Sequence, residues 1–302
     1  MSRLAAAKPA VPAPDALAAL ELLKPITWFP PMWAFACGVV TATGTRAAPW
    51  PLVVLGVALC GPLVCGTSQA VNDWFDRHVD ALNEPHRPIP SGRLPGRWGL
   101  YIAIGWTAVS LLAALAFGAF GFWATVAGLA LAWAYSAPPL RLKRNGWWGN
   151  SAVAACYEGL PWVTGVTVVT GAAPEWQVFA IAGLYSLGCH GIMTLNDFKS
   201  VSGDLRMGIG SLPARLGPEL AARVACWVMA VPQVVVIALL WSWGRQGHAL
   251  GVLGVLVAQL LLMRRLLTDP RKLAPWYNGT GITLYVSGMM VAGFALRAVI
   301  AP

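Results

Sequence analysis

The chain has 302 residues, of which 57% are hydrophobic and only 11% are charged, and its net charge at pH 7 is +9. Soluble domains carry about 25% charged residues, so this composition argues against a water-soluble globular protein. No nucleic-acid-binding motif accompanies the positive charge, which argues against nucleic acid as a partner. The six cysteines form no CxxC pair and indicate neither a zinc site nor a disulfide framework.

Several apolar stretches approach 20 residues, enough to cross a bilayer core of about 30 Å. They lack the alternation typical of a β-barrel, so the predicted fold is an all-α polytopic membrane protein. Residues 1–23 are expected to form a short N-terminal tail and residues 24–302 a single transmembrane domain. About nine helices are predicted, over residues 27–43, 51–71, 98–118, 121–137, 148–170, 176–195, 218–243, 248–267 and 280–299.

The basic residues predict the direction of these helices. With the N-terminus in the cytoplasm, the even-numbered connections hold fourteen Lys and Arg residues, and the odd-numbered ones hold only Arg46 and Arg245. Cytoplasmic loops are enriched in Lys and Arg, so this asymmetry supports nine helices and a cytoplasmic N-terminus. The first residues show neither a signal peptide nor a long transit peptide, which favours a bacterial inner membrane, cytoplasmic or intracytoplasmic.

Six of the twelve acidic residues, counting Glu84, gather in two clusters, each of which follows a long apolar segment. The first reads Asn72-Asp73-x-x-Asp76-x-x-x-Asp80, and the second begins with Asn196-Asp197 and extends to Asp204. Each Asn-Asp pair is followed by an aromatic residue, a faint repeat that two related halves around one site would explain. Both clusters are predicted to lie at the cytoplasmic face.

The spacing of these acids indicates a metal site. Residues three or four apart, such as the aspartates of the first cluster, share one face of a helix. Residues seven apart, such as Asp197 and Asp204, lie two turns apart on the same face. Like charges on one face repel unless a cation binds them, and Mg²⁺ typically bridges one or two carboxylates to substrate phosphates. We expect Mg²⁺, with Mn²⁺ as the alternative, at Asn72, Asp73, Asp76, Asp80, Asp197 and Asp204. Within this set the catalytic candidates are Asp73, Asp76, Asp197 and Asp204.

Two facing carboxylate clusters suit a diphosphate leaving group, because bound metal neutralises the charge that develops on it. An allylic prenyl diphosphate would ionise toward a carbocation there, and a nucleophile would capture it. Charge-assisted contacts to the phosphates are expected from Arg77, Arg141, Lys143, Lys199, Arg206 and Asn196. The alternative is that the acids are solvated loop charges paired with neighbouring arginines, although ionisable groups at a membrane edge are functional candidates by default.

The first cluster resembles the Asn-Asp-x-x-Asp-x-x-x-Asp motif of the UbiA superfamily of intramembrane aromatic prenyltransferases. Longer strings resemble its chlorophyll and bacteriochlorophyll synthase subfamily, with the bacteriochlorophyll branch as the nearer match. The strings are KPITWFPPMWAF from Lys24, NDWFDRHVDALNEPHRPIPSGR from Asn72, YSAPPLRLKRNGWWGN from Tyr135 and NDFKSVSGDLRMGIGSLP from Asn196. Chlorophyll synthases usually have Glu where this chain has Ser202, which puts the role of a carboxylate there in question.

The resemblance implies a UbiA-type bundle with a central cavity and Mg²⁺ held by the two acidic clusters. It implies the esterification of the propionate carboxylate of bacteriochlorophyllide by geranylgeranyl or phytyl diphosphate, within bacteriochlorophyll biosynthesis. The expected partners are these two substrates, membrane lipid and other pigment-biosynthesis or assembly proteins. Chlorophyllide, a quinone precursor or haem are alternative acceptors, and a cation transporter is the alternative of another class. A transporter would place acids near the bilayer midplane rather than at one face.

Overall fold

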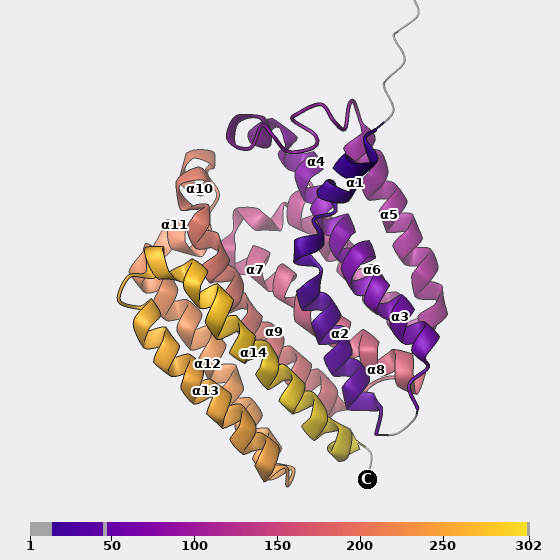
Figure 1. Ribbon diagram of the computed structural model, residues 1–302, viewed down its shortest axis with the longest axis vertical. Helices are drawn as coiled ribbons and strands as arrows, with labels where there is room; N and C mark the ends of the chain where they lie inside the picture. Colours follow the sequence, from indigo (N-terminus) through magenta and orange to yellow (C-terminus); the bar gives the residue numbers. More distant parts are fainter. Residues whose placement is uncertain (1–13, 45–46, 301–302) are drawn as a thin grey trace, which may run out of the picture.

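The computed structural model describes residues 14–44 and 47–300, which form a bundle of helices without a named β-strand (Figure 1). The predicted all-α class is thereby confirmed. Most of the predicted N-terminal tail, residues 1–13, and the loop residue Arg46 lie outside the described residues.

Seven helical stretches within the described ranges are long and apolar enough to cross a membrane, as expected for a multi-pass membrane protein. Alongside them lies the shorter apolar helix α2 (Phe29–Ala42). The number nine stays a prediction. The seven stretches are Trp50–Asn83 (α3, η2, α4), Trp98–Ser136 (α5, η3, α6), Gly146–Thr170 (α7, η5, α8), Trp176–Lys199 (α9, η6), Pro218–Ser242 (α12), Gln246–Leu266 (α13) and Pro270–Ile300 (α14).

The stretch Trp98–Ser136 reverses direction at Gly118. This residue has a φ of 68°, which glycine adopts without the steric cost that a Cβ would impose. The two arms α5 (Trp98–Ala114) and α6 (Gly118–Ser136) are joined by η3 (Leu115–Phe117). Nε1 of Trp133 on α6 donates to Oγ1 of Thr107 on α5 over 3.1 Å. The arms therefore run antiparallel, which agrees with the two separate helices predicted over residues 98–118 and 121–137.

Small residues allow the central helices to approach closely. A Cβ built on Gly38 of α2 would lie 2.1 Å from the carbonyl oxygen of Trp162 on α8 (Leu160–Thr170). A Cβ on Gly165 would lie 2.2 Å from the carbonyl oxygen of Phe35 in the opposite direction. Helix contacts in membranes depend on such packing because lipid tails provide no hydrophobic force between helices.

Two spans contain π-helical segments, in which the turn is wider than in an α-helix. The first, η2 (Leu59–Cys65), joins α3 (Trp50–Ala58) to α4 (Gly66–Asn83) and contains Pro62, which lacks a backbone N–H. The second, η5 (Ala155–Gly159), joins α7 (Gly146–Ala154) to α8. Segments of this kind are frequent at functional sites. Both lie beside the interior space described below.

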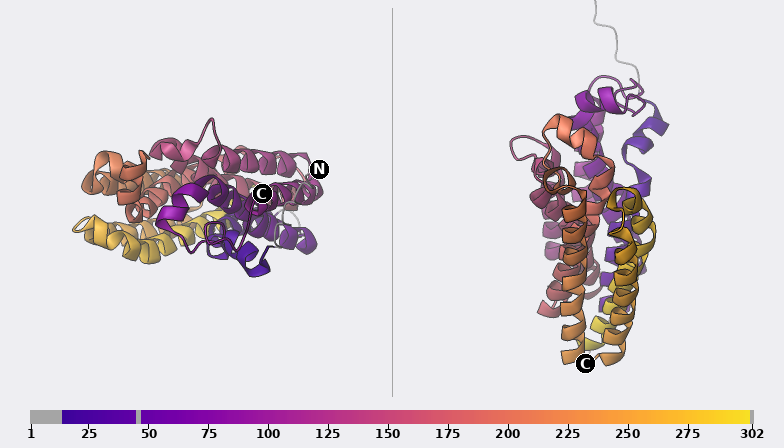
Figure 2. Two further views of the ribbon diagram at one scale, coloured as in Figure 1. Left: turned by 90° about the horizontal axis from the view of Figure 1, so that it is seen from above. Right: turned by 90° about the vertical axis from the view of Figure 1, so that its left-hand side faces the viewer.

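The short elements gather at one end of the bundle, where α4 and α9 (Trp176–Asn196) also end (Figures 1 and 2). The C-terminal end of α14 lies at the opposite end (Figure 1). The two acidic clusters are thereby brought to the same end, as predicted. The short elements are α1 (Ala16–Leu22), η1 (Pro25–Thr27), η4 (Leu142–Arg144), η6 (Asp197–Lys199), α10 (Val201–Met207) and α11 (Leu212–Leu216).

Helix α1 packs on the loop that follows α4. Asp15 caps it by accepting a hydrogen bond from the backbone of Leu17, and Leu22 is fully buried. Arg93 of the loop forms an ion pair with Glu21 over 2.6 Å, and its hydrogen bonds lower the pKa of that carboxyl. Residues 16–22 are thus attached to the body of the protein, and the single domain over residues 24–302 stays a prediction.

Candidate functional site

Helix α4 forms one wall of a cavity of about 780 Å³. Asn72, Asp76 and Asp80 line this wall, and their spacing of four residues aligns them in one stripe along the helix. Nδ2 of Asn72 donates to Oγ of Ser136, at the end of α6, over 3.2 Å. Three members of the first predicted cluster therefore face the same space.

Asp73 lies outside the lining of this cavity, contrary to the expectation that it joins the other acids. Its Oδ1 accepts hydrogen bonds from Nζ of Lys24 at 2.6 Å and from Nη1 of Arg87 at 3.5 Å, and its side chain is 3% exposed. Asp73 shares a helical face with Asp80, seven residues on, but its hydrogen-bond partners direct it at the N-terminal segment and the loop after α4.

Two of the predicted diphosphate contacts also point elsewhere. Nη1 of Arg77 donates to the carbonyl oxygen of Trp74 over 2.6 Å, and its guanidinium stacks on the Trp74 ring at 4.1 Å. Oδ1 of Asn196 accepts a hydrogen bond from Nδ2 of Asn278 on α14 over 2.6 Å. Neither side chain lines the cavity. Each is adjacent in sequence to an acid that does line it, so the turn of the helix directs it away.

The second acidic cluster forms the opposite wall, although not on one continuous helix as expected. The chain leaves the 3-10 turn η6 at Ser200 and begins α10 one residue later, and both Asp197 and Asp204 line the cavity. Nδ2 of Asn150 on α7 donates to Oδ2 of Asp197 over 3.1 Å. Oδ2 of Asp204 accepts hydrogen bonds from the hydroxyls of Ser200 at 2.9 Å and Ser211 at 2.6 Å.

Asp76 is held by two cations from the loop between α6 and α7. Nζ of Lys143 contacts both carboxylate oxygens of Asp76, and Nη2 of Arg141 lies 3.4 Å from Oδ1. Burial lowers the pKa of the Lys143 ammonium, and the charge of Asp76 opposes that shift. A bridge between the backbones of Asn145 and Gly210 joins this loop to the segment after α10. Both walls of the cavity are therefore tied together.

Asp80 is paired with Arg87, which comes from the proline-containing segment after α4. Nη1 of Arg87 lies 2.9 Å from Oδ2 of Asp80. Burial lowers the pKa of this guanidinium, but Asp73 and Asp80 together outweigh burial and the pKa is raised. Arg87 lines the cavity, so this segment contributes to the site rather than only connecting two helices.

The remaining basic predictions agree with the geometry, and the structure adds residues that the sequence did not single out. Arg141, Lys143, Lys199 and Arg206 all line the cavity. The four strings that carry the resemblance contain these additional residues, although their spacing alone gave none of them a role. The additional lining residues include Arg87, Arg144, Asn150 and Ser211.

The cavity suits a metal bound together with an anionic ligand better than a metal bound by protein alone. Among residues 14–44 and 47–300, no three carboxylate, imidazole or thiol groups converge closely enough to hold a metal ion. Carboxylates nevertheless line both walls, and Mg²⁺ commonly takes only one or two of them plus phosphate oxygens. Nε of Arg141 is buried and has no hydrogen-bond acceptor in the described protein, which leaves a donor for an anion.

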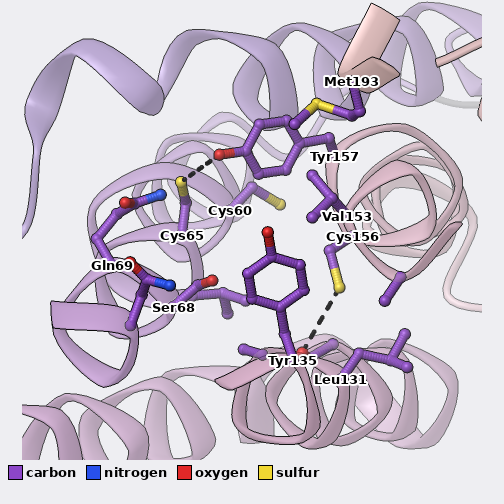
Figure 3. Close-up of a pocket in the computed structure, with 15 residues that line it drawn as sticks. Cys60, Cys65, Ser68, Gln69, Leu131, Tyr135, Val153, Cys156, Tyr157 and Met193 are labelled. Carbon is purple, nitrogen blue, oxygen red and sulfur yellow. Dashed lines mark hydrogen bonds between the residues drawn. The ribbon is translucent and has the colours of Figure 1, made fainter. Parts of the chain in front are cut away.

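A narrower, more apolar space continues from this cavity between the helices. It has a volume of about 160 Å³ and shares Asn72 and Tyr135 with the polar cavity. Figure 3 shows Tyr135 and Tyr157 projecting into it from different helices. A third space, of about 30 Å³, shares Cys60, Val64, Gly128 and Cys156 with the second. The two smaller spaces are neighbours through these shared residues, and together they are called the apolar corridor.

The UbiA prenyltransferase family model matches residues 31–288. The chain belongs to the UbiA prenyltransferase family. It is 60% identical to the bacteriochlorophyll synthase 33 kDa chain of Cereibacter sphaeroides, over 95% of this chain and 94% of that protein. It is 36% identical to a chloroplastic chlorophyll synthase of Oryza sativa, over 91% and 76% of the two chains. These values place it in the chlorophyll and bacteriochlorophyll synthase subfamily and make it a prenyltransferase.

The fold of this UbiA prenyltransferase also occurs in a solved UbiA homologue from Archaeoglobus fulgidus, described as bound to GPP and Mg²⁺. The TM-score is 0.73 at 20% identity, and the match covers 93% of this chain and 99% of that one. A divalent metal and a prenyl diphosphate are thus bound by a protein of the same family and fold. At this identity the likeness concerns the fold alone.

Asp76 lines the cavity and Asp73 does not, and substitutions of the two residues in this UbiA prenyltransferase test that difference. Asp76→Asn should weaken the binding of Mn²⁺ together with inorganic diphosphate by about tenfold or more, because a ligand is lost. Asp73→Asn should leave that affinity within about threefold of the wild type, because Asp73 is directed away from the cavity. Isothermal titration calorimetry of the detergent-solubilised protein measures both values.

Lys24→Gln is the matched control, since it removes the same ion pair from its other partner. It should behave as Asp73→Asn does. Equal weakening by Asp73→Asn and Asp76→Asn, with Lys24→Gln unchanged, would show that Asp73 binds the metal after all.

Proposed function

We propose that this chain transfers a geranylgeranyl or phytyl group from its diphosphate to the propionate carboxylate of bacteriochlorophyllide. The structural observation that supports the proposal is that a cavity lined by acids and cations borders an apolar corridor, with Asn72 and Tyr135 lining both. A prenyl diphosphate has the same two parts, a trianionic head and a long apolar chain. The 60% identity to a bacteriochlorophyll synthase supports the choice of acceptor.

The head of the donor is proposed to lie between the two acidic walls. Asp76, Asp80, Asp197 and Asp204, with Asn72, are the oxygen donors available to Mg²⁺, or to Mn²⁺ in its place. When bound, the metal neutralises the negative charge that develops on the departing diphosphate. Charge-assisted hydrogen bonds to the phosphate oxygens are proposed for Arg87, Arg141, Lys143, Lys199 and Arg206.

The cations are already in place before the substrate arrives. Lys143 and Arg141 contact Asp76, and Arg87 contacts Asp80, so the carboxylates orient the cations that face the cavity. Preorganised donors stabilise developing charge without paying for reorganisation during the reaction. This arrangement favours departure of the diphosphate over simple binding.

The reaction then needs no strong base. The bond between C1 of the prenyl group and the diphosphate oxygen breaks, and the diphosphate leaves with the electron pair. One oxygen of the acceptor carboxylate donates a pair to C1 and forms the ester. A propionate is already ionised at neutral pH, so no proton has to be removed. The chain's part is to bind, orient and shield the reacting atoms.

The prenyl chain is proposed to occupy the apolar corridor. Its wall includes Tyr135 and Tyr157 near the polar cavity and small side chains farther on (Figure 3). The protein is proposed to lie in a bacterial inner membrane, cytoplasmic or intracytoplasmic, with the N-terminus and the polar cavity toward the cytoplasm. The gathering of basic loops and acid clusters at one end of the bundle supports this orientation.

The first experiment supplies membrane fractions containing the chain with geranylgeranyl diphosphate, Mg²⁺ and bacteriochlorophyllide. Chromatography should detect an esterified pigment, and chelation of the divalent metal should abolish it. Chlorophyllide, a quinone precursor and haem are supplied in parallel as competing acceptors. If one of these is prenylated while bacteriochlorophyllide is not, the proposed acceptor is wrong.

Removal of one cavity carboxylate tests the metal site in the same assay. Asp76→Asn should lower the rate of ester formation by about a hundredfold or more, because the bound metal supplies several kcal/mol of charge stabilisation. Glu175→Gln is the matched control, since it makes the same chemical change on an exposed residue at the start of α9. Near-normal turnover by Asp76→Asn, with normal membrane insertion, would contradict the role of the first cluster.

Gly128 provides a test of the corridor. A Cβ on this residue would lie 3.7 Å from Leu160 and from Val64. A larger side chain at this position would therefore narrow the corridor. Gly128→Leu should lower ester formation from geranylgeranyl diphosphate about tenfold relative to geranyl diphosphate, because overfilling a packed apolar space costs about 1–3 kcal/mol. Competition between the two donors measures this ratio.

Gly105→Leu is the control, since a Cβ on this exposed glycine would meet nothing within 4 Å. It should leave the donor ratio unchanged. An equal loss with both donors in Gly128→Leu would show that the prenyl chain does not pass this glycine.

A further inference from the structure

A second groove lies beside α10 and borders the polar cavity. Its volume is about 320 Å³, and its apolar lining includes Phe198, Val201 and Leu205. The lining also holds two cations, Lys199 from η6 and Arg271 from the first turn of α14. The groove thus combines an apolar lining with two cations from separate elements.

Arg271 forms no ion pair with another described residue, whereas Lys199 interacts electrostatically with Asp197. Leu205 is 62% exposed, and Arg271, which lines the same groove, is the second residue of the span Pro270–Ile300. An exposed apolar side chain beside an unpaired cation at the end of a span matches a ligand with an anionic head and an apolar body.

The groove lies beside the short segment that carries both acids of the second cavity wall. Helix α10 has seven residues and stands above the ends of the long helices (Figure 1). It carries Asp204, and the preceding turn carries Asp197, so both acids of the second wall depend on this segment. Lys199 and Ser202 line the outer groove as well as the polar cavity. A ligand in the groove would connect this segment to α14.

We propose that the groove binds the headgroup of an anionic phospholipid and that the lipid braces the segment carrying the second acidic cluster. The phosphate lies against Arg271 and the first acyl carbons cover Leu205, while Lys199, which lies between the groove and the polar cavity, remains a contact of the donor diphosphate. The membrane setting favours a lipid over a soluble anion, because basic pockets between transmembrane helices bind anionic headgroups. The inference goes beyond the proposed function, and its test requires no turnover.

The test measures lipid retention by the full chain purified from membranes containing equal parts of phosphatidylcholine and phosphatidylglycerol. Native mass spectrometry should find phosphatidylglycerol retained by the wild type. Arg271→Gln should reduce this retention about fivefold, the effect expected for one cation near an anionic headgroup. Lys272→Gln, which removes the neighbouring charge outside the groove, should retain the lipid as the wild type does.

Hydrogen exchange of the backbone amides in α10 provides the second readout. Phosphatidylglycerol should slow exchange there in the wild type and in Lys272→Gln, but not in Arg271→Gln. Equal loss of phosphatidylglycerol in Arg271→Gln and Lys272→Gln would show that general surface charge holds the lipid, and it would overturn the proposal. Unchanged retention in Arg271→Gln would also overturn it. Slowing of exchange by inorganic phosphate in phosphatidylcholine alone would identify a soluble anion instead and would also overturn it.

Discussion

The active end of this protein depends on the neutralisation of carboxylates that converge where the helices end. Charges placed in a poorly solvated setting are costly unless they are paired and hydrogen-bonded. The first cluster meets this constraint with cations from three separate segments, since Lys24 precedes α2, Arg87 follows α4 and Lys143 follows α6. The ion pairs therefore fix the positions of loops whose sequences alone look like connectors.

The same need for charge neutralisation links the residues that line the cavity to the residues that hold the surrounding loops. Asp73 faces away from the cavity and holds Lys24 and Arg87, and Arg87 in turn reaches Asp80 inside the cavity. One acid of the motif thus positions the residues around another. The four polar residues of the motif therefore have two roles: Asn72, Asp76 and Asp80 line the cavity, and Asp73 anchors the surrounding loops.

Sequence reasoning identified the helical class, the common face of the two clusters and most of the cations, because hydropathy, charge asymmetry and spacing are local properties. The structure places Asp73, Arg77 and Asn196 outside the lining of the polar cavity, and spacing alone gives the relative phase of residues on a helix but not which of them face a cavity. Sequence reasoning assigned no role to Asn150, whose contact with Asp197 joins two distant helices. The acceptor came from family resemblance, since no physical property of the acids distinguishes one carboxylate nucleophile from another.

The charges around the cavity bear on the acceptor and on Ser202. In the part of the chain that the structure describes, the lining holds the acids Asp76, Asp80, Glu84, Asp197 and Asp204 and the cations Arg87, Arg141, Lys143, Arg144, Lys199 and Arg206. The cations exceed the acids by one. A Glu in place of Ser202, which also lines the cavity, would remove this excess. Because the proposed reaction brings an anionic carboxylate to an anionic diphosphate, a net positive lining lowers their mutual repulsion. Ser202 is therefore compatible with the chemistry, and the absence of a carboxylate at this position favours the approach of a second anion.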